Sequence, residues 1–174
     1  TSLLPFAAKA APNATLLALR GRATDEGTPR WFRRFSANKF DQADIASEAE
    51  ALAAFVDGAV EAYRLDPQKL VFLGHSNGAN MLAATMLLHP HVIRRAALLR
   101  AAMVLEQPPA ADLSDAEVLL VAGDVDVFSS FGPELAGLLQ SNGAIVDART
   151  IPSGHAFEAA DIEIVREWLA ARDL

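Results

Sequence analysis

A serine flanked by glycines stands where the chain is expected to turn from a strand into a helix. The segment from Gly74 to Gly78 reads G-H-S-N-G, directly after the apolar, β-prone residues 70–73 and before a helix-like segment. In this setting a sharp turn exposes the serine hydroxyl, and small neighbours avoid a steric clash. The new helix directs its N-terminal amides and dipole at developing negative charge. The pattern therefore predicts Ser76 as a nucleophile, and the alternative interpretation is an ordinary glycine-rich turn.

A general base for this serine would be a histidine later in the chain, in a loop that follows a strand. His155 meets both conditions, because it comes soon after the β-prone residues 144–151. It would take the proton of Ser76 and later return it to the leaving group. The remaining histidines are better explained by packing in the elbow or by exposure at a helix end: His75, His89 and His91.

An acid that orients the base is expected between the serine and the histidine in the sequence. The apolar residues 118–122 are followed by Gly-Asp-Val-Asp, so Asp124 and Asp126 compete for this role. We favour Asp126, since the carboxylate must reach over the sheet edge and Asp124 lies closer to the end of the strand. For the other aspartate, the simpler interpretation is a turn residue that bonds to its own backbone.

Apolar β-prone runs alternate with helix-like segments along the chain, and this order predicts a mostly parallel α/β sheet with helices on both faces. Ligands bind at the carboxyl ends of the strands in such sheets, so the candidate residues are expected at one edge. Residues 21–41 are predicted to form a long loop at that same edge. The predicted strands are 15–19, 70–73, 96–99, 118–122 and 144–151, and the predicted helices are 44–65, 79–89, 133–140 and 156–171.

The composition indicates one well-buried domain over residues 1–174, with 52% hydrophobic and 21% charged residues. The net charge of −7 argues against a nucleic-acid partner, because the only basic cluster is Arg30 to Arg34. The absence of cysteine excludes disulfides, thiolate metal sites and a cysteine nucleophile, and it suits a reducing compartment. No apolar run is long enough for a membrane span, and residues 1–19 lack a signal-peptide pattern. We therefore expect a cytoplasmic protein.

These motifs resemble those of the phospholipase/carboxylesterase family of α/β hydrolases, which is related to acyl-protein thioesterases and dienelactone hydrolases. The chain looks closest to the bacterial hydroquinone-inducible carboxylesterases. The resemblance implies an α/β-hydrolase fold, a triad of Ser76, Asp126 and His155, and no metal or organic cofactor. Many relatives carry proline after the triad acid, whereas this chain has Val127. The matching segments cover nearly the whole chain in order: P-R-W-F-R-R at 29–34, F-D-Q-A-D at 40–44, G-H-S-N-G-A-N at 74–80, G-D-V-D at 123–126 and G-H at 154–155.

The chain departs from the family pattern most clearly at its front. Relatives carry a strand ending in His-Gly-x-Gly before the Leu-Leu-Pro segment that matches residues 3–5, and that strand is absent here. The resemblance implies that the missing loop supplies one oxyanion amide and that the backbone N–H of Asn77 supplies the other. We therefore expect the working protein to carry an N-terminal piece before Thr1, with its strand between residues 15–19 and 70–73.

The aromatic and basic part of the 21–41 loop is expected beside the nucleophile and contains the candidate substrate contacts. Trp31 and Phe32 would form the wall of an acyl or aryl pocket. Arg33 or Arg34 would meet an anionic group of the substrate.

Two features have a structural as well as a functional interpretation. The loop could be pinned by burial of its aromatic side chains, with its arginines paired to Asp41 or Asp44. The last helix carries Ile164, Trp168 and Leu169, which would either form a homodimer patch or pack in the core. We prefer the core for the last helix and leave both interpretations of the loop open.

The preferred function is hydrolysis of small carboxylic esters through an acyl-enzyme on Ser76, and the resemblance implies that these are short-chain acyl or aryl esters. A first alternative is a lysophospholipase or acyl thioesterase, which a wide apolar groove lined by Trp31 and residues 103–109 would favour. A second alternative is a non-catalytic binding protein that retains the fold, although the correct order of the triad residues argues against it. A dienelactone-type hydrolase is disfavoured, because that family generally uses a cysteine nucleophile.

Overall fold

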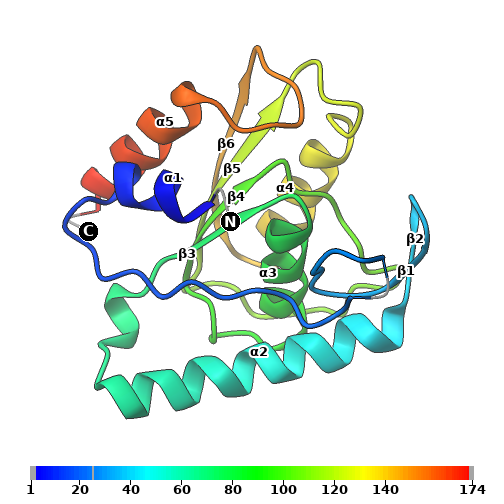
Figure 1. Ribbon diagram of the computed structural model, residues 1–174, viewed down its shortest axis with the longest axis horizontal. Coiled ribbons are helices and arrows are strands. Elements are labelled where there is room, and N and C mark those ends of the chain that lie inside the picture. The colour runs from blue at the N-terminus through cyan, green and yellow to red at the C-terminus, as the bar shows by residue number, and fades with distance from the viewer. Residues whose placement is uncertain (1–2, 25, 173–174) are drawn as a thin grey trace.

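Four parallel strands form the central sheet, and their order in space equals their order in the chain (Figure 1). The computed structural model describes residues 3–24 and 26–172. Because the strands are parallel, their carboxyl ends share one edge of the sheet. The strands are β3 (Phe72–His75), β4 (Arg95–Leu99), β5 (Glu117–Gly123) and β6 (Ile145–Ile151).

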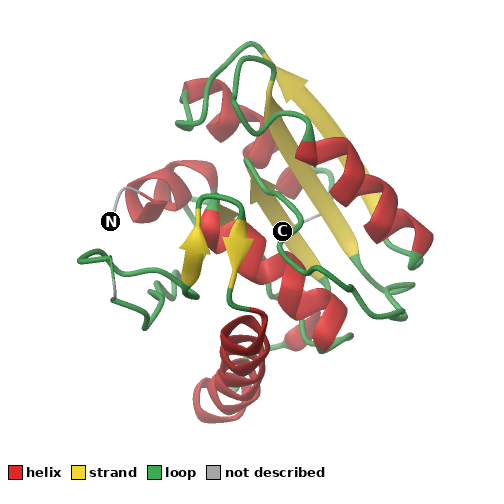
Figure 2. Cartoon of the chain, turned by 90° about the vertical axis from the view of Figure 1, so that its right-hand side faces the viewer, coloured by secondary structure: helices red, strands yellow, loops and turns green. Residues whose placement is uncertain are grey.

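Helices cover both faces of this sheet (Figures 1 and 2). They are α1 (Leu3–Ala10), α2 (Gln42–Tyr63), α3 (Asn77–Leu88), α4 (Phe131–Ser141) and α5 (Ala159–Ala170). The helices α1 and α5 pack on one face, whereas α3 and α4 pack on the other and α2 packs against α3. A small hairpin, β1 (Arg34–Ser36) and β2 (Lys39–Phe40), precedes α2, and a 3₁₀ turn at Pro67–Lys69 follows it.

The two faces of the sheet bury alternate residues of the same strands. Leu98 and Leu120 pack in the core beneath α3 and α4, while the next residues, Leu99 and Val121, pack with α1 and α5. All four side chains are buried. Since helices cover both faces, β4 and β5 present no solvent-facing side, and this explains the uninterrupted apolar sequences that predicted them.

The predicted α/β-hydrolase architecture is confirmed, and the boundaries of the predicted helices and of four of the predicted strands shift by at most three residues. The hairpin in the 21–41 loop and the helix α1 are not indicated by the sequence pattern. In α1, Phe6 is buried and its ring meets the ring of Phe157 edge to face, with centroids 5.0 Å apart. A helix of eight residues is marginal alone, so this tertiary packing stabilises it.

The strand predicted at residues 15–19 is wrong. The segment belongs to no strand, and Leu17 is 53% exposed. In the part of the chain that the structure describes, the segment pairs with no neighbouring strand, and a β-prone segment without a partner cannot form a ladder.

The strand β3 lies at an edge of the four-stranded sheet and pairs with β4. Direct pairing of residues 15–19 with β3 would have contradicted the expectation of a further strand between them. Among the described residues, this pairing is not present. The expectation of an N-terminal piece before Thr1 therefore stays a prediction.

The apolar residues of the last helix lie in the core. Trp168 and Leu169 are buried together with Phe6 of α1. The preferred interpretation, in which these side chains pack in the core, is therefore confirmed. They do not form a homodimer patch, and homodimer formation stays a prediction. No helix within residues 3–24 and 26–172 combines the length and apolar character needed to cross a membrane.

Candidate active site

Ser76 occupies a strained turn between β3 and α3. Its backbone has φ 51° and ψ −119°, in the left-handed half of conformational space that side chains other than glycine rarely adopt. Its backbone N–H donates to the carbonyl of Leu99 at 2.8 Å, which anchors the turn to the neighbouring strand. At Gly74, a Cβ atom would lie only 2.7 Å from backbone atoms of Ala79. Only glycine allows the start of α3 to approach β3 this closely.

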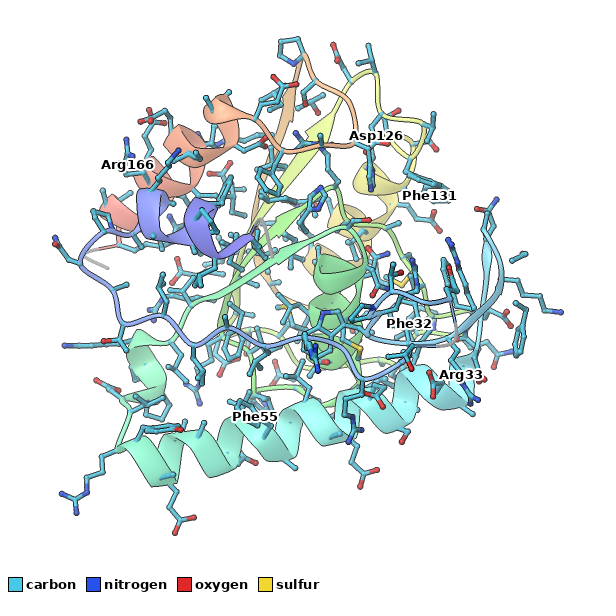
Figure 3. The ribbon with its side chains drawn as sticks, viewed as in Figure 1. Phe32, Arg33, Phe55, Asp126, Phe131 and Arg166 are labelled. Atoms are coloured by element: carbon cyan, nitrogen blue, oxygen red, sulfur yellow. The ribbon has the colours of Figure 1, made fainter. Side chains whose placement is uncertain are left out.

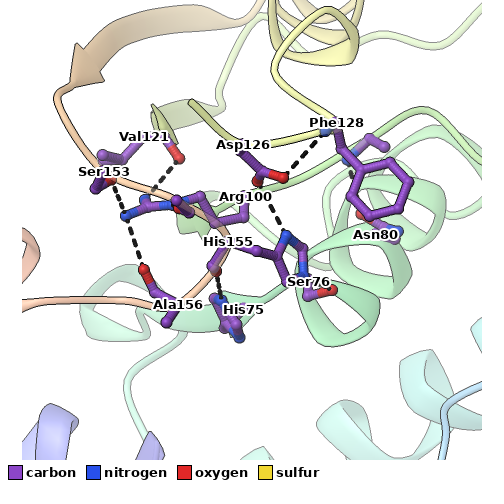
Figure 4. A network of polar contacts seen from close by, with 12 residues as sticks. His75, Ser76, Asn80, Arg100, Val121, Asp126, Phe128, Ser153, His155 and Ala156 are labelled. Atoms are coloured by element: carbon purple, nitrogen blue, oxygen red, sulfur yellow. Dashed lines mark hydrogen bonds and ion pairs between the residues drawn. The ribbon is translucent and has the colours of Figure 1, made fainter. Parts of the chain in front are cut away.

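The structure brings Ser76, His155 and Asp126 into one hydrogen-bonded series (Figure 4). The Nε2 atom of His155 lies 2.8 Å from Oγ of Ser76, and its Nδ1 atom lies 2.9 Å from Oδ2 of Asp126. A carboxylate only accepts hydrogen bonds, so Nδ1 carries the proton that is donated to Asp126. The unprotonated Nε2 of a neutral imidazole can then accept the hydroxyl proton of Ser76.

Asp126, and not Asp124, is the carboxylate that meets the imidazole. The Asp126 side chain is 2% exposed, and its Oδ1 atom accepts the backbone N–H of Phe128 at 3.0 Å. Asp124 is exposed to solvent, and its backbone N–H donates to the carbonyl of Ile151. Of the two aspartates, the preferred one therefore contacts His155, and its Oδ1 atom also makes the local turn bond that was expected of the other.

Gly123 allows the loops of Asp126 and His155 to meet. A Cβ atom at Gly123 would lie 2.3 Å from the carbonyl oxygen of Ser153 and 2.7 Å from that of Gly154. The Phe128 ring also packs edge to face against the His155 imidazole, with centroids 5.5 Å apart. His155 keeps 40% of its side chain exposed, so a substrate can reach it from solvent.

Asn77 is the first residue of α3, directly after Ser76. Its backbone N–H is one of the amides that find no acceptor inside a helix, and it lies at the positive end of the helix dipole. Its side-chain Oδ1 atom accepts the backbone N–H of Trp31 at 2.7 Å. The first turn of α3 therefore offers a donor to negative charge formed beside Ser76.

Trp31 lies next to this turn. Besides its bond to Asn77, its indole Nε1 atom is 3.3 Å from the position that a Cβ atom would take at Gly78. The second glycine of the G-x-S-x-G pattern thus leaves room for the indole. Of the candidate substrate-binding residues Trp31, Phe32 and Arg33, Trp31 is the one that contacts the turn at Ser76.

Phe32 and Arg33 are held by the protein itself (Figure 3). Phe32 has no exposed surface and meets Phe40 edge to face, with ring centroids 5.6 Å apart. Arg33 pairs with Asp41 at 3.1 Å and with Asp44 at 3.4 Å. These contacts match the structural interpretation of the loop, because Phe32 has no surface to offer a substrate and Arg33 is paired with two carboxylates.

A buried arginine that was not among the predicted site residues lies at the same edge of the sheet. Arg100 directly follows β4, has φ 54° and is 3% exposed. It forms two hydrogen bonds of 2.9 Å with the carboxylate of Asp161, and neither side chain has exposed surface. The available signal was a charged residue between the apolar runs 96–99 and 101–104, where a buried strand ends.

His75 also has a more specific contact than elbow packing. Its Nε2 atom lies 2.8 Å from the backbone carbonyl oxygen of His155, so Nε2 carries a proton and donates it. Burial lowers the pKa of His75 below its ordinary value of 6.5, because a charged imidazole would lose its hydration there. His75 is therefore neutral at neutral pH.

Within the described residues, no group of three or more histidine, aspartate or glutamate side chains is arranged to hold a metal ion. The expectation of a site that works without a metal or an organic cofactor stays a prediction.

The chain is similar to known proteins of one hydrolase family. The model of the Phospholipase/Carboxylesterase family matches residues 11–172. The Bacillus subtilis (strain 168) protein MhqD is 32% identical over 163 residues, which cover 90% of this chain and 80% of MhqD.

Two solved structures have nearly the same fold. A carboxylesterase from Mesorhizobium loti is 46% identical with a TM-score of 0.94, and the match covers 97% of this chain and 81% of that one. The Bacillus cereus carboxylesterase is 30% identical with a TM-score of 0.92, covering 98% and 81% of the two chains. On this evidence the chain belongs to the phospholipase/carboxylesterase family of α/β hydrolases.

Proposed function

We propose that this protein is a serine carboxylesterase that hydrolyses small carboxylic esters through an acyl-enzyme on Ser76. The observation that supports this proposal best is the pair of hydrogen bonds on either side of the His155 imidazole, 2.8 Å to Ser76 and 2.9 Å to Asp126. This is the hydrogen-bonding pattern that a nucleophile, its general base and an orienting acid require.

In the acylation step, Nε2 of His155 takes the hydroxyl proton as Oγ of Ser76 attacks the ester carbonyl carbon. Asp126 stabilises the imidazolium that forms. The carbonyl oxygen becomes negatively charged, and the backbone N–H of Asn77 donates to it at the start of α3. The imidazolium then protonates the departing alkoxide, and the alcohol leaves.

In the deacylation step, water takes the place of the alcohol. His155 removes a proton from this water, which attacks the acyl carbon, and the carboxylic acid departs as Ser76 regains its proton. Both steps need the same placement of the imidazole, so any change that displaces His155 lowers the rate of acylation and of deacylation.

Short acyl or aryl esters are the proposed substrates. The similar proteins from Mesorhizobium loti and Bacillus cereus are described as carboxylesterases, and this supports ester hydrolysis. The side chain of His155 is 40% exposed, which suits a substrate that approaches from solvent. Trp31 beside Asn77 offers an apolar surface to the acyl or aryl group.

The test is hydrolysis of p-nitrophenyl esters from acetate to palmitate by the wild type and by Ser76→Ala. We expect turnover of the acetate by the wild type, loss of that turnover in Ser76→Ala, and lower kcat/KM for longer chains. A preference for the palmitate would favour the lysophospholipase or thioesterase alternative. Equal rates for the two proteins would favour the non-catalytic alternative and overturn the proposal.

A further inference from the structure

His155 lies in a segment without regular secondary structure, between the end of β6 and the start of α5. A general base in such a segment must still be held to within a fraction of an ångström of its nucleophile, because a displacement of about 1 Å can lower a rate about 10²-fold. Two side chains at the carboxyl ends of β3 and β4, those of His75 and Arg100, donate hydrogen bonds to the backbone of this segment.

The backbone carbonyls of three consecutive residues, Gly154, His155 and Ala156, each accept a hydrogen bond from a side chain (Figure 4). Arg100 donates from Nε to Gly154 at 2.9 Å and from Nη2 to Ala156 at 3.3 Å. His75 donates to the carbonyl between them at 2.8 Å. The backbone of the base is therefore bonded at its own carbonyl and on both sides.

Both donors are also connected to Ser76. His75 is covalently bonded to Ser76, so one residue joins the nucleophile to the backbone of the base. Arg100 follows Leu99, whose carbonyl accepts the N–H of Ser76 at 2.8 Å. Two short and independent paths thus connect Ser76 with the segment of His155, and both begin at the carboxyl ends of β3 and β4.

The guanidinium of Arg100 is itself fixed. It bonds to both oxygens of Asp161 at 2.9 Å and to Oγ of Ser153 at 2.8 Å. Asp161 also accepts the N–H of Glu158 at 2.7 Å, in the capping box that begins α5. Taking this ion pair out of water is costly, and fully paired buried charges hold their partners in a single arrangement.

We propose that Arg100, oriented by Asp161, and His75 are positioning residues that set the distance between His155 and Ser76. This inference rests on the proposed function and extends it, because it assigns the placement of the general base to two side chains that bond to its backbone. The ring of His75 also lies beside the ring of His155, with centroids 5.4 Å apart. Arg100 contributes more to this positioning than His75, since it bonds to the backbone on both sides of His155 and to the side chain of Ser153.

The experiment measures kcat and KM for p-nitrophenyl acetate in the full chain. The variants are Arg100→Met, Arg100→Lys, His75→Leu and His75→Gln, each checked for folding by its urea transition. Glutamine keeps an N–H donor near the position of Nε2, whereas leucine removes it. The matched control is Arg95→Met, because Arg95 begins β4, at the end opposite to Arg100, and pairs with Glu117 at 3.2 Å.

We expect kcat to fall about 10²-fold in Arg100→Met while KM changes little, because substrate binding does not involve this residue. His75→Leu should lose about tenfold in kcat, and His75→Gln should recover most of that loss. The proton NMR signal of the His155 Nδ1–H should shift or broaden in Arg100→Met and in His75→Leu. Arg95→Met should change neither kcat nor this signal.

Two results separate this inference from the proposed function. If the wild type is active, Ser76→Ala is inactive and folded Arg100→Met has the kcat of Arg95→Met, then the positioning role is wrong and the esterase proposal stands. If the wild type itself does not hydrolyse the ester, the proposed function fails first. Should Arg100→Met not fold, Arg100→Lys and His75→Leu decide, and a wild-type kcat in both of these variants overturns the role.

Discussion

The guanidinium of Arg100 and the carboxylate of Asp161 form two hydrogen bonds of 2.9 Å in a place where neither side chain reaches solvent. The pair joins the end of β4 to the first turn of α5, and the segment of His155 lies between these two elements. A buried pair of this kind is most consequential when one partner is removed, because the other charge is then left without compensation.

Asp161→Asn should therefore lower the free energy of unfolding by about 3–5 kcal/mol. The control is Glu163→Gln on the same helix, which breaks the exposed pair with Arg166. This pair lies on a surface far from Asp126 (Figure 3). Its loss should change the free energy of unfolding by less than about 1 kcal/mol. Urea denaturation followed by circular dichroism measures both variants. Equal effects of the two substitutions would contradict the importance of the buried pair.

Asp126→Asn should reduce kcat by about 10⁴-fold, because an amide in place of the carboxylate favours the wrong tautomer of His155 and cannot stabilise its positive form. Asp124→Asn serves as the matched control two residues away, since Asp124 is exposed. Its kcat should stay within about twofold of the wild type. Steady-state hydrolysis of p-nitrophenyl acetate distinguishes them, and a larger loss in Asp124→Asn would assign the acid to that residue instead.

Gly74→Ala should destabilise the fold, because its new Cβ atom would lie 2.7 Å from the backbone of Ala79 and neither β3 nor α3 can yield without displacing Ser76. Gly58→Ala provides the opposite control on α2, where a Cβ atom meets nothing within 4 Å. Alanine there should stabilise by about 0.5–1 kcal/mol through its better helix propensity. Thermal unfolding of the two variants should move the midpoint in opposite directions.

The stability of the protein should depend on pH partly through His75. Burial lowers its pKa below the ordinary value of 6.5; the nearby His155 and Arg100 lower it further, while the hydrogen bond to the carbonyl of His155 and the charge of Asp161 oppose the shift. With a lowered pKa in the folded state, the unfolded chain binds more protons as the pH falls. The contribution of His75 is therefore complete above pH 6.5 and is lost as the pH falls towards its folded-state pKa.

The corresponding measurement compares the free energy of unfolding at about pH 7.5 and pH 5.5 in urea. We expect the wild type to lose more stability on acidification than His75→Gln, which has no group to titrate at this position. His91→Gln is the control, because His91 is largely exposed beside Asp115. An identical loss in the wild type and in His75→Gln would argue against the burial of a neutral imidazole at this position.

Much of the site could be predicted because its residues follow apolar segments directly. Ser76 comes after β3, Asp126 after β5 and His155 after β6, and parallel strands bring their carboxyl ends to one edge of a sheet. Gly74 could also be predicted as a steric requirement, because a sharp turn between a strand and a helix leaves no room for a larger side chain. Local order, residue type and the two-sided burial of parallel strands are all visible in a linear sequence.

The rest depends on contacts between residues far apart in the chain. Three contacts cannot be seen in a local pattern, because each depends on which segments pack against each other. They are the pairing of Arg100 with Asp161, the packing of Phe32 against Phe40 and the pairing of Arg33 with Asp41. A β-prone sequence also does not become a strand without a partner, as residues 15–19 illustrate.

The linear order of the chain was thus sufficient for the α/β architecture and for naming the candidate nucleophile, the candidate base and two candidate acids, since periodicity and local turns depend on neighbours in sequence. Only the folded chain decided that Asp126 rather than Asp124 meets the imidazole, and that Arg100 and His75 hold the backbone of His155. Hydrogen bonds and ion pairs act over about 3 Å, and separations of that size between distant residues are set by tertiary packing.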